Sequence, residues 1–455
     1  MRQQGRLPFE YEVDDEADNV TSFGGLPLVA EVMAKFGLDE SIRRHVRLGR
    51  ARRKFEADDI ARAAILTVIA GGDCLDDIAR LRDDAALCRL LARDIPSPET
   101  VRQALYEFHS DALIEEGIRL AADAGEIAYV PGESVPLKGL GQALRELNAS
   151  VQRRWPQQEA TVDIDATLQE STKKEAKRHY AGGRGYQPML AYWTEQQVVI
   201  FDEFRDGNVA AAMDTDELVE RVFAALPEGI SVRRCRADSA LYAEKTIRWL
   251  NDQAIEFAIG VRTHPPFVRA CETLPESAWT FCEQHARAEL HVAELDYRPP
   301  WARRLAGLRY IAVRKTPRQQ EFFEESQGPV YLGVVTNRRG NASDVVHWYW
   351  DKAGTIEHAH DVVKNELGGG VLPCGRFGAN AAWLRLCVLA FNVLRIVREL
   401  GPTDLRDARP KRLRFNLFSL PATVASHARS LVARLGQKLE RARQVVTIRE
   451  MIWAT

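Results

Sequence analysis

The amino-acid sequence predicts an α/β protein with a central sheet and with helical regions at both ends of the chain. Residues 1–155 carry apolar side chains at helical spacing. From about residue 158 the pattern changes to short strands that alternate with helices, and helical patterns return after residue 342. The 455 residues are 45% hydrophobic and 28% charged, which indicates a globular protein of about two to four domains.

The composition argues against several protein classes. No apolar run approaches the roughly 20 residues of a membrane-spanning helix, and the first residues lack the apolar segment of a secretory signal. The seven cysteines form no C-x-x-C pair and are odd in number, so we expect free thiols in a reducing compartment. These features predict a cytoplasmic protein with no membrane partner.

The basic residues are clustered, although the net charge of the chain is only −2. The clusters cover residues 43–54, 173–185 and 406–414. A single basic cluster is usually a solvated face, but three in one chain favour a nucleic-acid partner.

The first 155 residues are expected to form several short helices. An apolar periodic segment at 57–70 stops at Gly71-Gly72, and the pattern continues through 74–92. Ser97 is placed to cap a helix that begins at Pro98. Helix, short break and helix is the pattern of a helix-turn-helix DNA reader, and a plain helical bundle fits equally well.

The middle of the chain predicts three consecutive strands, then helix, strand, helix and strand. The strands are expected at 160–167, 187–193, 196–205, 229–239 and 255–262, and the helices at 215–226 and 240–253. Residues 263–342 interrupt this rhythm with prolines, aromatics and alternating runs. We interpret them as a mainly β insertion whose last run, 330–337, returns to the main sheet.

Three helices are expected after the insertion, at 355–367, 380–400 and 421–444. The second is apolar nearly all round, which predicts burial. The predicted division is therefore 1–155 for a helical DNA-binding or dimerisation region and 156–262 for the first part of the core. It continues with 263–342 for the insertion, 343–400 for the second part of the core and 401–455 for a C-terminal helical region.

Acidic residues recur at positions where a sheet can bring them together. Asp163 and Asp165 share a face of the first strand, and Asp238 ends the fourth. If these strands are neighbours, their acids meet at one edge of the sheet, where ligands of open α/β folds bind. Glu357, on a late helix, is the candidate third acid.

Three converging carboxylates repel one another unless a cation neutralises them. Hard oxygen ligands without a Cys/His motif suit Mg²⁺ or Mn²⁺, and two such ions about 4 Å apart can drive phosphodiester cleavage. Periodicity does not choose between Asp163 and Asp165. Asp165 lies nearer the strand end, which leaves Asp163 as a supporting acid or as the partner of a basic residue.

The acids also lie in recognisable motifs. Asp165 begins Asp-Ala-Thr, and Asp238 lies in Arg-Ala-Asp-Ser. Glu357 and Lys364 have the spacing of the last two residues of the signature Y-(2)-R-(3)-E-(6)-K. In this alignment Trp350 and Ala353 stand for the Tyr and the Arg, and Lys352, beside Ala353, is a candidate substitute for the missing Arg.

The sequence resembles bacterial DDE-type insertion-sequence transposases that carry a β insertion between the second Asp and the Glu. The resemblance rests on these motifs and on segments 70–84, 96–105 and 372–392. The resemblance covers the chain from about residue 20 to its last residues. It implies a ribonuclease H-like core and dependence on Mg²⁺, for which Mn²⁺ can substitute. It also implies cut-and-paste movement of terminal inverted repeats into target DNA by a homodimer.

The resemblance implies that Asp165, Asp238 and Glu357 are the catalytic residues and the metal ligands. Two rival functions are a related nuclease that does not transfer strands, and a silent DNA-binding protein descended from a transposase. The predicted DNA-binding residues are Lys364, Lys173, Lys174, Arg178, Arg184, Arg303 and Arg304. The alternative for Lys364 is a salt bridge, and for Lys173, Lys174, Arg178 and Arg184 it is a solvated loop. For Arg303 and Arg304 the alternative is that the insertion only braces the structure.

Overall fold

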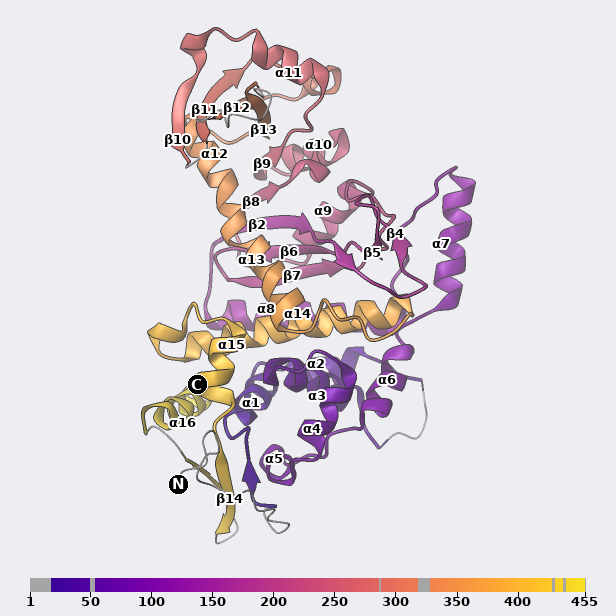
Figure 1. Ribbon diagram of the computed structural model, residues 1–455, viewed down its shortest axis with the longest axis vertical. Coiled ribbons are helices and arrows are strands. Elements are labelled where there is room, and N and C mark those ends of the chain that lie inside the picture. The colour runs from indigo at the N-terminus through magenta and orange to yellow at the C-terminus, as the bar shows by residue number, and fades with distance from the viewer. Residues whose placement is uncertain are drawn as a thin grey trace, which may run out of the picture.

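The computed structural model describes residues 18–49, 54–285, 288–317, 328–427, 430–436 and 439–454. Residues 50–53 of the first predicted basic cluster therefore lie outside the described residues, as do residues 1–17. Figure 1 shows an elongated molecule with a large sheet in its upper and middle parts and with helices gathered below it.

The N-terminal region is a set of short helices, as expected. The helix at Pro98 begins with Ser97 as its cap, because the Ser97 hydroxyl accepts a hydrogen bond from the Thr100 amide at 3.2 Å. The segment 74–92 is less regular than expected, since the helix breaks before Asp84, which caps the next one. The helices are α1 Pro27–Lys35, α2 Leu38–His45, α3 Ala57–Ala70, α4 Ile78–Arg82, α5 Ala85–Leu91, α6 Pro98–Tyr106, α7 Asp111–Asp123 and α8 Val135–Arg154.

The predicted strands and helices of the core are all present. The strands are β2 Glu159–Ala166, β6 Met189–Trp193, β7 Val198–Glu203, β8 Val232–Ala237 and β9 Glu256–Gly260, and the helices are α9 Thr215–Ala224 and α10 Glu244–Asp252. In the sheet they run in the order β9-β8-β2-β6-β7. β2 is parallel to β8 and antiparallel to β6. An antiparallel hairpin beside parallel strands in this order is the arrangement of a ribonuclease H-like core.

The insertion extends this sheet rather than forming a separate one. Its strands are β10 Thr280–Gln284, β11 Ala288–Leu295, β12 Arg309–Pro317 and β13 Val330–Thr336, and it also contains the helix α11 Pro265–Glu272. β13 returns to the core as expected, because it pairs with β9 through Val334 and Gly260. The result is one nine-stranded sheet.

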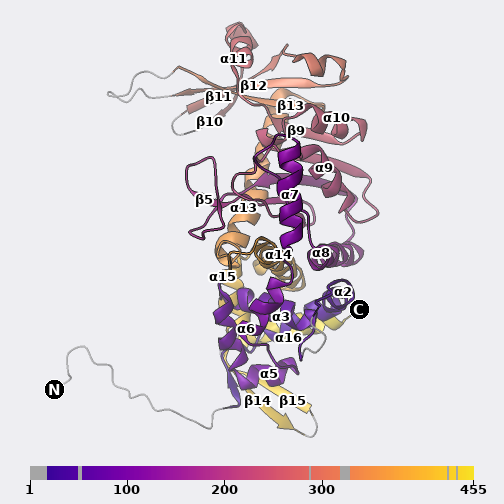
Figure 2. The ribbon, with the colours of Figure 1, turned by 90° about the vertical axis from the view of Figure 1, so that its right-hand side faces the viewer.

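Each face of the core sheet packs against a different group of helices. Val162 and Ile164 point to the face covered by α9 and α10. The neighbouring positions of β2, Asp163 and Asp165, point to the opposite face, where α13 Ile356–Asp361 packs on β2 and β6. Figure 2 shows α13 and α9 on opposite sides of the sheet. A three-stranded sheet of β3 Gln169–Glu170, β5 Arg184–Tyr186 and β4 Lys177–Arg178 follows β2.

A run of helices crosses the sheet from the insertion to the lower half of the molecule. It comprises α12 Ala342–Trp350, α13 and α14 Phe377–Leu400. Among the described residues, α14 is long and apolar enough to cross a membrane by length and composition, but its apolar window is entirely buried in the protein. It forms the core of the lower half, which confirms the burial predicted for residues 380–400.

The C-terminal region differs from the expected helix. β14 Ala422–His427 and β15 Ser430–Leu435 form an antiparallel pair in the expected helical segment, of whose described residues only those of α16 Leu439–Trp453 are helical. A short helix, α15 Pro410–Leu413, precedes β14. β14 also pairs with β1 Val20–Thr21, so a strand from the other end of the chain supplies the partner that favours extended structure. Pairing between remote segments has overridden the helical pattern, as sheet contacts often do.

Two buried asparagines join the sheet to the helices below it. Asn392 Oδ1 accepts a hydrogen bond from the Val199 amide at 3.0 Å, and Asn392 Nδ2 donates to the Val199 carbonyl at 2.8 Å. Asn392 Nδ2 also donates to Asn148 Oδ1 at 2.9 Å. The Asn392 side chain, on the largely apolar α14, thus forms hydrogen bonds with backbone groups on the outer edge of β7. Without it, these groups would be free to pair with another strand.

We expect Asn392→Leu to lower the free energy of unfolding by about 2–4 kcal/mol, because it leaves buried polar groups of Val199 and Asn148 without partners. Chemical denaturation followed by circular dichroism measures the change. The matched control is Asn208→Leu, at an exposed asparagine, for which we expect a change within about 0.5 kcal/mol. Equal stability of the two variants would show that the Asn392 contacts do not hold β7.

Candidate active site

The sheet brings the first two predicted acids together. In the parallel pair β2–β8, Asp163 lies opposite Arg236 and Ile164 opposite Ala237. The next residues along the two strands are Asp165 and Asp238, at the carboxyl ends of both strands. Asp238 Oδ1 accepts a hydrogen bond from the Ala240 amide at 2.9 Å, which fixes the side chain at the start of a turn.

The third acid lies on the helix that covers this edge. Glu357 is in the first turn of α13, and its side chain is 56% exposed. The negative charges of Asp238 and Glu357 both act on Asp165, and all three acids act on the hydroxyl of Tyr349. The three predicted acids therefore lie within electrostatic range of one another.

Asp163 has a different environment from Asp165, although both point to the same face. Asp163 is fully buried and forms an ion pair with Arg236, with Nε–Oδ1 at 2.6 Å and Nη2–Oδ2 at 2.8 Å. Thr194 donates to Asp163 Oδ2 at 3.0 Å, and the hydroxyl of Thr355 donates to the same oxygen. Of the two roles left open by the sequence, Asp163 has the contacts of a partner for a basic residue.

The Asp163–Arg236 pair also positions the helices that carry Glu357. Arg236 Nη1 donates to the carbonyl oxygen of Trp348 at 2.8 Å, in the last part of α12. Thr355, which contacts Asp163, directly precedes α13. One buried pair thus connects the two acid-bearing strands with the segment that leads to Glu357.

Burial, together with the nearby charges of Asp238 and Glu357, raises the pKa of Asp165 to about 6, although the positive charge of Lys352 opposes the rise. The carboxylate form is therefore disfavoured in the folded protein without a metal ion. This contribution destabilises the fold at pH values above about 6 and disappears below the ordinary aspartate pKa of 3.8.

Two residues beside the acids, Tyr349 and Lys352, differ from the pair that the signature alignment selected, although Lys352 was already the candidate substitute for the Arg. Tyr349 and Lys352 have the spacing of its Tyr and Arg, but residues 353–356 separate Lys352 from Glu357, one residue more than the signature allows. A 3-10 turn at Asp351–Gly354 accommodates the extra residue. Ala353, aligned with the Arg, is exposed instead.

Tyr349 and Lys352 both face the site. The Tyr349 hydroxyl lies 2.8 Å from the position that a Cβ atom on Gly260 would take, so the glycine at the end of β9 leaves room for it. Burial raises the pKa of Tyr349, and the three acids raise it further, so its hydroxyl stays protonated as a hydrogen-bond donor. Lys352 Nζ lies 3.9 Å from Glu357 Oε1.

Lys364 also lies near this edge. It is in a π-helical turn, Val362–Glu366, and its Nζ donates to the carbonyl oxygen of Leu168 at 2.8 Å. The alternative salt bridge with Asp361 is not formed, because Asp361 pairs with Arg409. Burial lowers the pKa of His360 to about 4, so this neutral ring donates from Nε2 to the Asp165 carbonyl, at 3.3 Å.

The other predicted DNA-binding residues lie on two surface elements. Lys174, Arg178 and Arg184 are exposed and Lys173 is half-buried on and around the small sheet that follows β2. Arg303 and Arg304 are exposed on a 3-10 turn, Pro300–Arg304. Trp301 of that turn packs against Tyr242, four residues after Asp238, which places the turn at the acid-bearing edge of the sheet.

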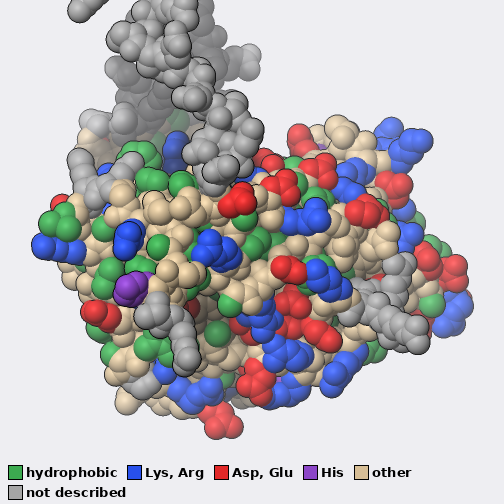
Figure 3. Space-filling view, turned by 90° about the horizontal axis from the view of Figure 1, so that it is seen from below, with side chains coloured by type: hydrophobic (Ala, Val, Ile, Leu, Met, Phe, Trp, Pro, Cys, Tyr) green, Lys and Arg blue, Asp and Glu red, His purple; other side chains and the backbone are tan. Residues whose placement is uncertain are grey.

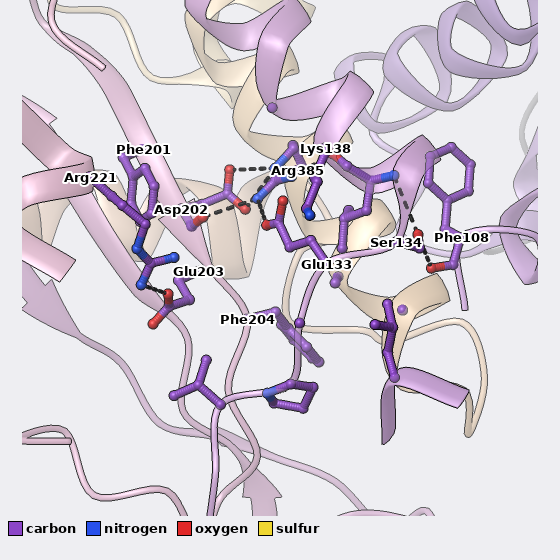
Figure 4. A pocket seen from close by; sticks show the side chains of 18 of the residues that line it. Phe108, Glu133, Ser134, Lys138, Phe201, Asp202, Glu203, Phe204, Arg221 and Arg385 are labelled. Atoms are coloured by element: carbon purple, nitrogen blue, oxygen red, sulfur yellow. Dashed lines mark hydrogen bonds and ion pairs between the residues drawn. The ribbon is translucent and has the colours of Figure 1, made fainter. Parts of the chain in front are cut away.

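Two other features resemble sites but have structural explanations. A cavity of about 550 Å³ lies beside β7, and the buried charges in its wall are already paired, since Arg385 binds Asp202 and Glu133 (Figure 4). Asp73, Cys74 and Asp77 bring possible metal-ligand atoms within 4.8 Å of one another. The Asp77 carboxylate there accepts the amides of Asp73 and Cys74, as in an ordinary helix cap.

The end of the molecule formed by the N-terminal helices and the C-terminal segment has no uniform charge on the face shown in Figure 3. Lys and Arg side chains are interspersed with Asp and Glu on it. In these two segments, Arg93 pairs with Asp59 at 2.8 Å and Arg449 pairs with Glu31 at 2.9 Å. This face therefore does not support non-specific DNA binding as well as a continuous basic surface would.

We expect Asp165→Asn to stabilise the metal-free protein at pH 7 by about 1–3 kcal/mol, because it removes a carboxylate whose pKa burial has raised by about two units. Thermal unfolding in EDTA measures this. The gain should fall as the pH is lowered from about 6 to 4, where the wild-type carboxyl becomes protonated. A variant less stable than the wild type at pH 7 would contradict the assigned environment of Asp165.

Comparison with known proteins identifies the family of this chain. The family model described as transposase DDE domain group 1 matches residues 10–453, while no curated protein gives a significant match. Among solved structures, a piggyBac transposase synaptic complex with hairpin DNA, determined by cryo-EM, is 11% identical with a TM-score of 0.43. That match covers 87% of this chain and 77% of the other. Because the family match spans nearly all of it, this chain belongs to the transposases of DDE domain group 1.

Proposed function

We propose that this transposase moves an insertion sequence by a cut-and-paste reaction, with Asp165, Asp238 and Glu357 as its catalytic residues. The observation that carries the proposal is the meeting of Asp165 and Asp238 at adjacent ends of parallel strands, under the helix that bears Glu357. Asp163 is excluded from the same role by its buried contacts with Arg236 and Thr355.

The donor set fits a divalent metal such as Mg²⁺. All three side chains offer hard oxygen ligands. Burial first, and then the charges of Asp238 and Glu357, raise the pKa of Asp165, and a bound cation would keep the three carboxylates ionised together. Two such ions, shared among the three acids, are the arrangement that phosphodiester chemistry uses. When bound, the ions would polarise the scissile phosphate and activate the attacking oxygen.

The reaction we propose has two steps. In the first, a water oxygen forms a bond to phosphorus and the bond from phosphorus to the 3′ oxygen breaks, which leaves a free 3′-hydroxyl at the element end. In the second, that hydroxyl attacks a target phosphate and a target 3′ oxygen leaves. In this proposal the protonated Tyr349 hydroxyl would donate a hydrogen bond to the phosphate oxygens, and Lys364 would bind a neighbouring phosphate.

The DNA would lie along the acid-bearing edge. The cations around the small sheet, at Lys173, Lys174, Arg178 and Arg184, would bind phosphates on one side of the acids, and Arg303 and Arg304 on the other. A synaptic complex of two element ends calls for a homodimer on the terminal inverted repeats. We place this activity in the bacterial cytoplasm, on the nucleoid.

We expect Asp165→Asn to abolish cleavage of element ends but to preserve DNA binding, while Asp163→Asn retains measurable cleavage. The reason is that Asp163 contacts protein groups only, whereas Asp165 lies at the open edge. Because Asp163→Asn leaves a buried Arg236 without its partner, it should lower stability by about 3–5 kcal/mol, so assays belong well below its melting temperature. Cleavage with Mg²⁺ and gel-shift binding measure the two effects.

The same assay separates the rival functions. Products joined to target DNA indicate a transposase, whereas cleaved ends without joining indicate a nuclease. Absence of cleavage with both Mg²⁺ and Mn²⁺ in the wild type would indicate a silent DNA-binding descendant. A dead Asp163→Asn beside an active Asp165→Asn would show that the wrong acid of the pair has been assigned.

We expect the double charge reversal Arg303→Glu/Arg304→Glu to weaken binding to element ends and to make its salt dependence shallower. Each lost phosphate contact should reduce the slope of log K against log salt by about 0.9. Fluorescence anisotropy at several salt concentrations measures both quantities.

The matched control is Arg153→Glu/Arg154→Glu, an adjacent arginine pair in the last turn of α8, which leads into the start of β2 and so lies at the end of that strand remote from Asp165. We expect that control to change affinity and salt slope much less. Equal effects of the two double variants would remove Arg303 and Arg304 from the specific DNA surface and leave the insertion with a bracing role.

A further inference from the structure

One basic side chain lies among the three acids. Lys352 Nζ is 3.9 Å from Glu357 Oε1, and the Lys352 side chain is only 12% exposed. Its positive charge is also the main influence that opposes the raised pKa of Asp165. The ammonium group is therefore held in the field of the acids and is not extended into water, as most lysines are.

Local structure keeps Lys352 in this position. It lies in the 3-10 turn between α12 and α13, and its carbonyl oxygen accepts a hydrogen bond from the Thr355 amide at 3.2 Å. Its Nζ also lies 5.9 Å from the centroid of the Tyr349 ring, which faces the same acids. The extra residue in the turn thus directs a cation toward Glu357.

A cation at this position has a direct consequence for metal binding. The charges that would bind a divalent ion are partly neutralised by the ammonium group, so the ion must displace it or bind beside a like charge. A lysine is suited to such displacement, because it is a point charge on a flexible stem and has no fixed bidentate geometry.

We propose that Lys352 is an internal counter-cation of the catalytic site: it weakens divalent-metal binding in the DNA-free enzyme and moves to a DNA phosphate when the substrate arrives. The inference rests on the proposed function, because it takes Asp165, Asp238 and Glu357 as the metal ligands. Movement of Lys352 to the phosphate would free the carboxylates for the metal. DNA and metal would then strengthen each other's binding by the same factor.

The test measures binding of Mn²⁺, a spectroscopic probe for the divalent ion, to the full-length protein. Free Mn²⁺ is followed by electron paramagnetic resonance, with and without a DNA duplex of arbitrary sequence at low salt. In the DNA-free protein we expect Lys352→Met to bind Mn²⁺ about tenfold more tightly than the wild type, equivalent to about 1.4 kcal/mol. Addition of DNA should tighten Mn²⁺ binding in the wild type but much less in Lys352→Met.

Three further variants make the outcome specific. Lys54→Met removes a lysine that pairs with Asp94 at 2.6 Å on an exposed surface, and should leave Mn²⁺ affinity unchanged. Lys352→Arg keeps the charge and should bind Mn²⁺ in the DNA-free state as weakly as the wild type. If Lys352→Met does not fold, Lys352→Gln, which retains a polar side chain, takes its place in the same titration.

The outcomes separate this inference from the proposed function. If Asp165→Asn binds Mn²⁺ as well as the wild type does, the acids are not the metal site and the proposed function fails. If Asp165→Asn loses binding but Lys352→Met matches the wild type within twofold, the metal site stands and the role of Lys352 is wrong. Tighter binding in Lys352→Met, together with weak binding in Lys352→Arg and no effect in Lys54→Met, supports the inference.

Discussion

The buried ion pair between Asp163 and Arg236 determines the geometry of the rest of the site. Both side chains are almost fully buried, so the charge of each depends on the other for its compensation. The pair joins the two central strands of the core. It also contacts the Trp348 carbonyl in α12 and Thr355, which directly precedes the helix that bears Glu357. A buried pair of this kind adds little net stability, but it allows only one arrangement of the four elements that it connects.

Asp163 and Asp165 lie on the same strand but have different environments, which give the first a structural role and leave the second available for chemistry. Asp163 has a guanidinium group and two hydroxyls as partners, whereas Asp165, two residues later, has burial and two neighbouring acids. The first carboxylate is therefore neutralised within the fold, and the second remains available for a cation from outside. Lys352 neutralises the negative charge of Asp165 only in part. Functional sites commonly lower the stability of a protein in this way, because they hold charged groups without full compensation.

The core and its acids were predictable from the sequence because they depend on local patterns. Alternating strands, the position of Asp238 at a strand end and the burial of α14 follow from periodicity over short windows. The β14–β15 hairpin was not predictable, because its extended form depends on pairing with Val20 and Thr21 more than 400 residues away in the chain. Tyr349 was missed, and Lys352 was named only as a substitute beside the aligned Ala353, because motif spacing assumes a regular helix and the 3-10 turn at Asp351–Gly354 shifts the alignment by one residue.

The continuous sheet explains how an insertion of this size can act on chemistry that it does not contain. β13 pairs with β9, whose last residue, Gly260, leaves room for the Tyr349 hydroxyl. α12, which follows the insertion, packs against β9 and β11 on the way to Glu357. The insertion and the acid-bearing edge are thus parts of one hydrogen-bonded structure, and the exposed arginines near Trp301 are carried at a fixed place relative to the acids. A DNA contact made by the insertion would therefore fix the position of the scissile phosphate, because a hydrogen-bonded sheet has little freedom to bend between the two.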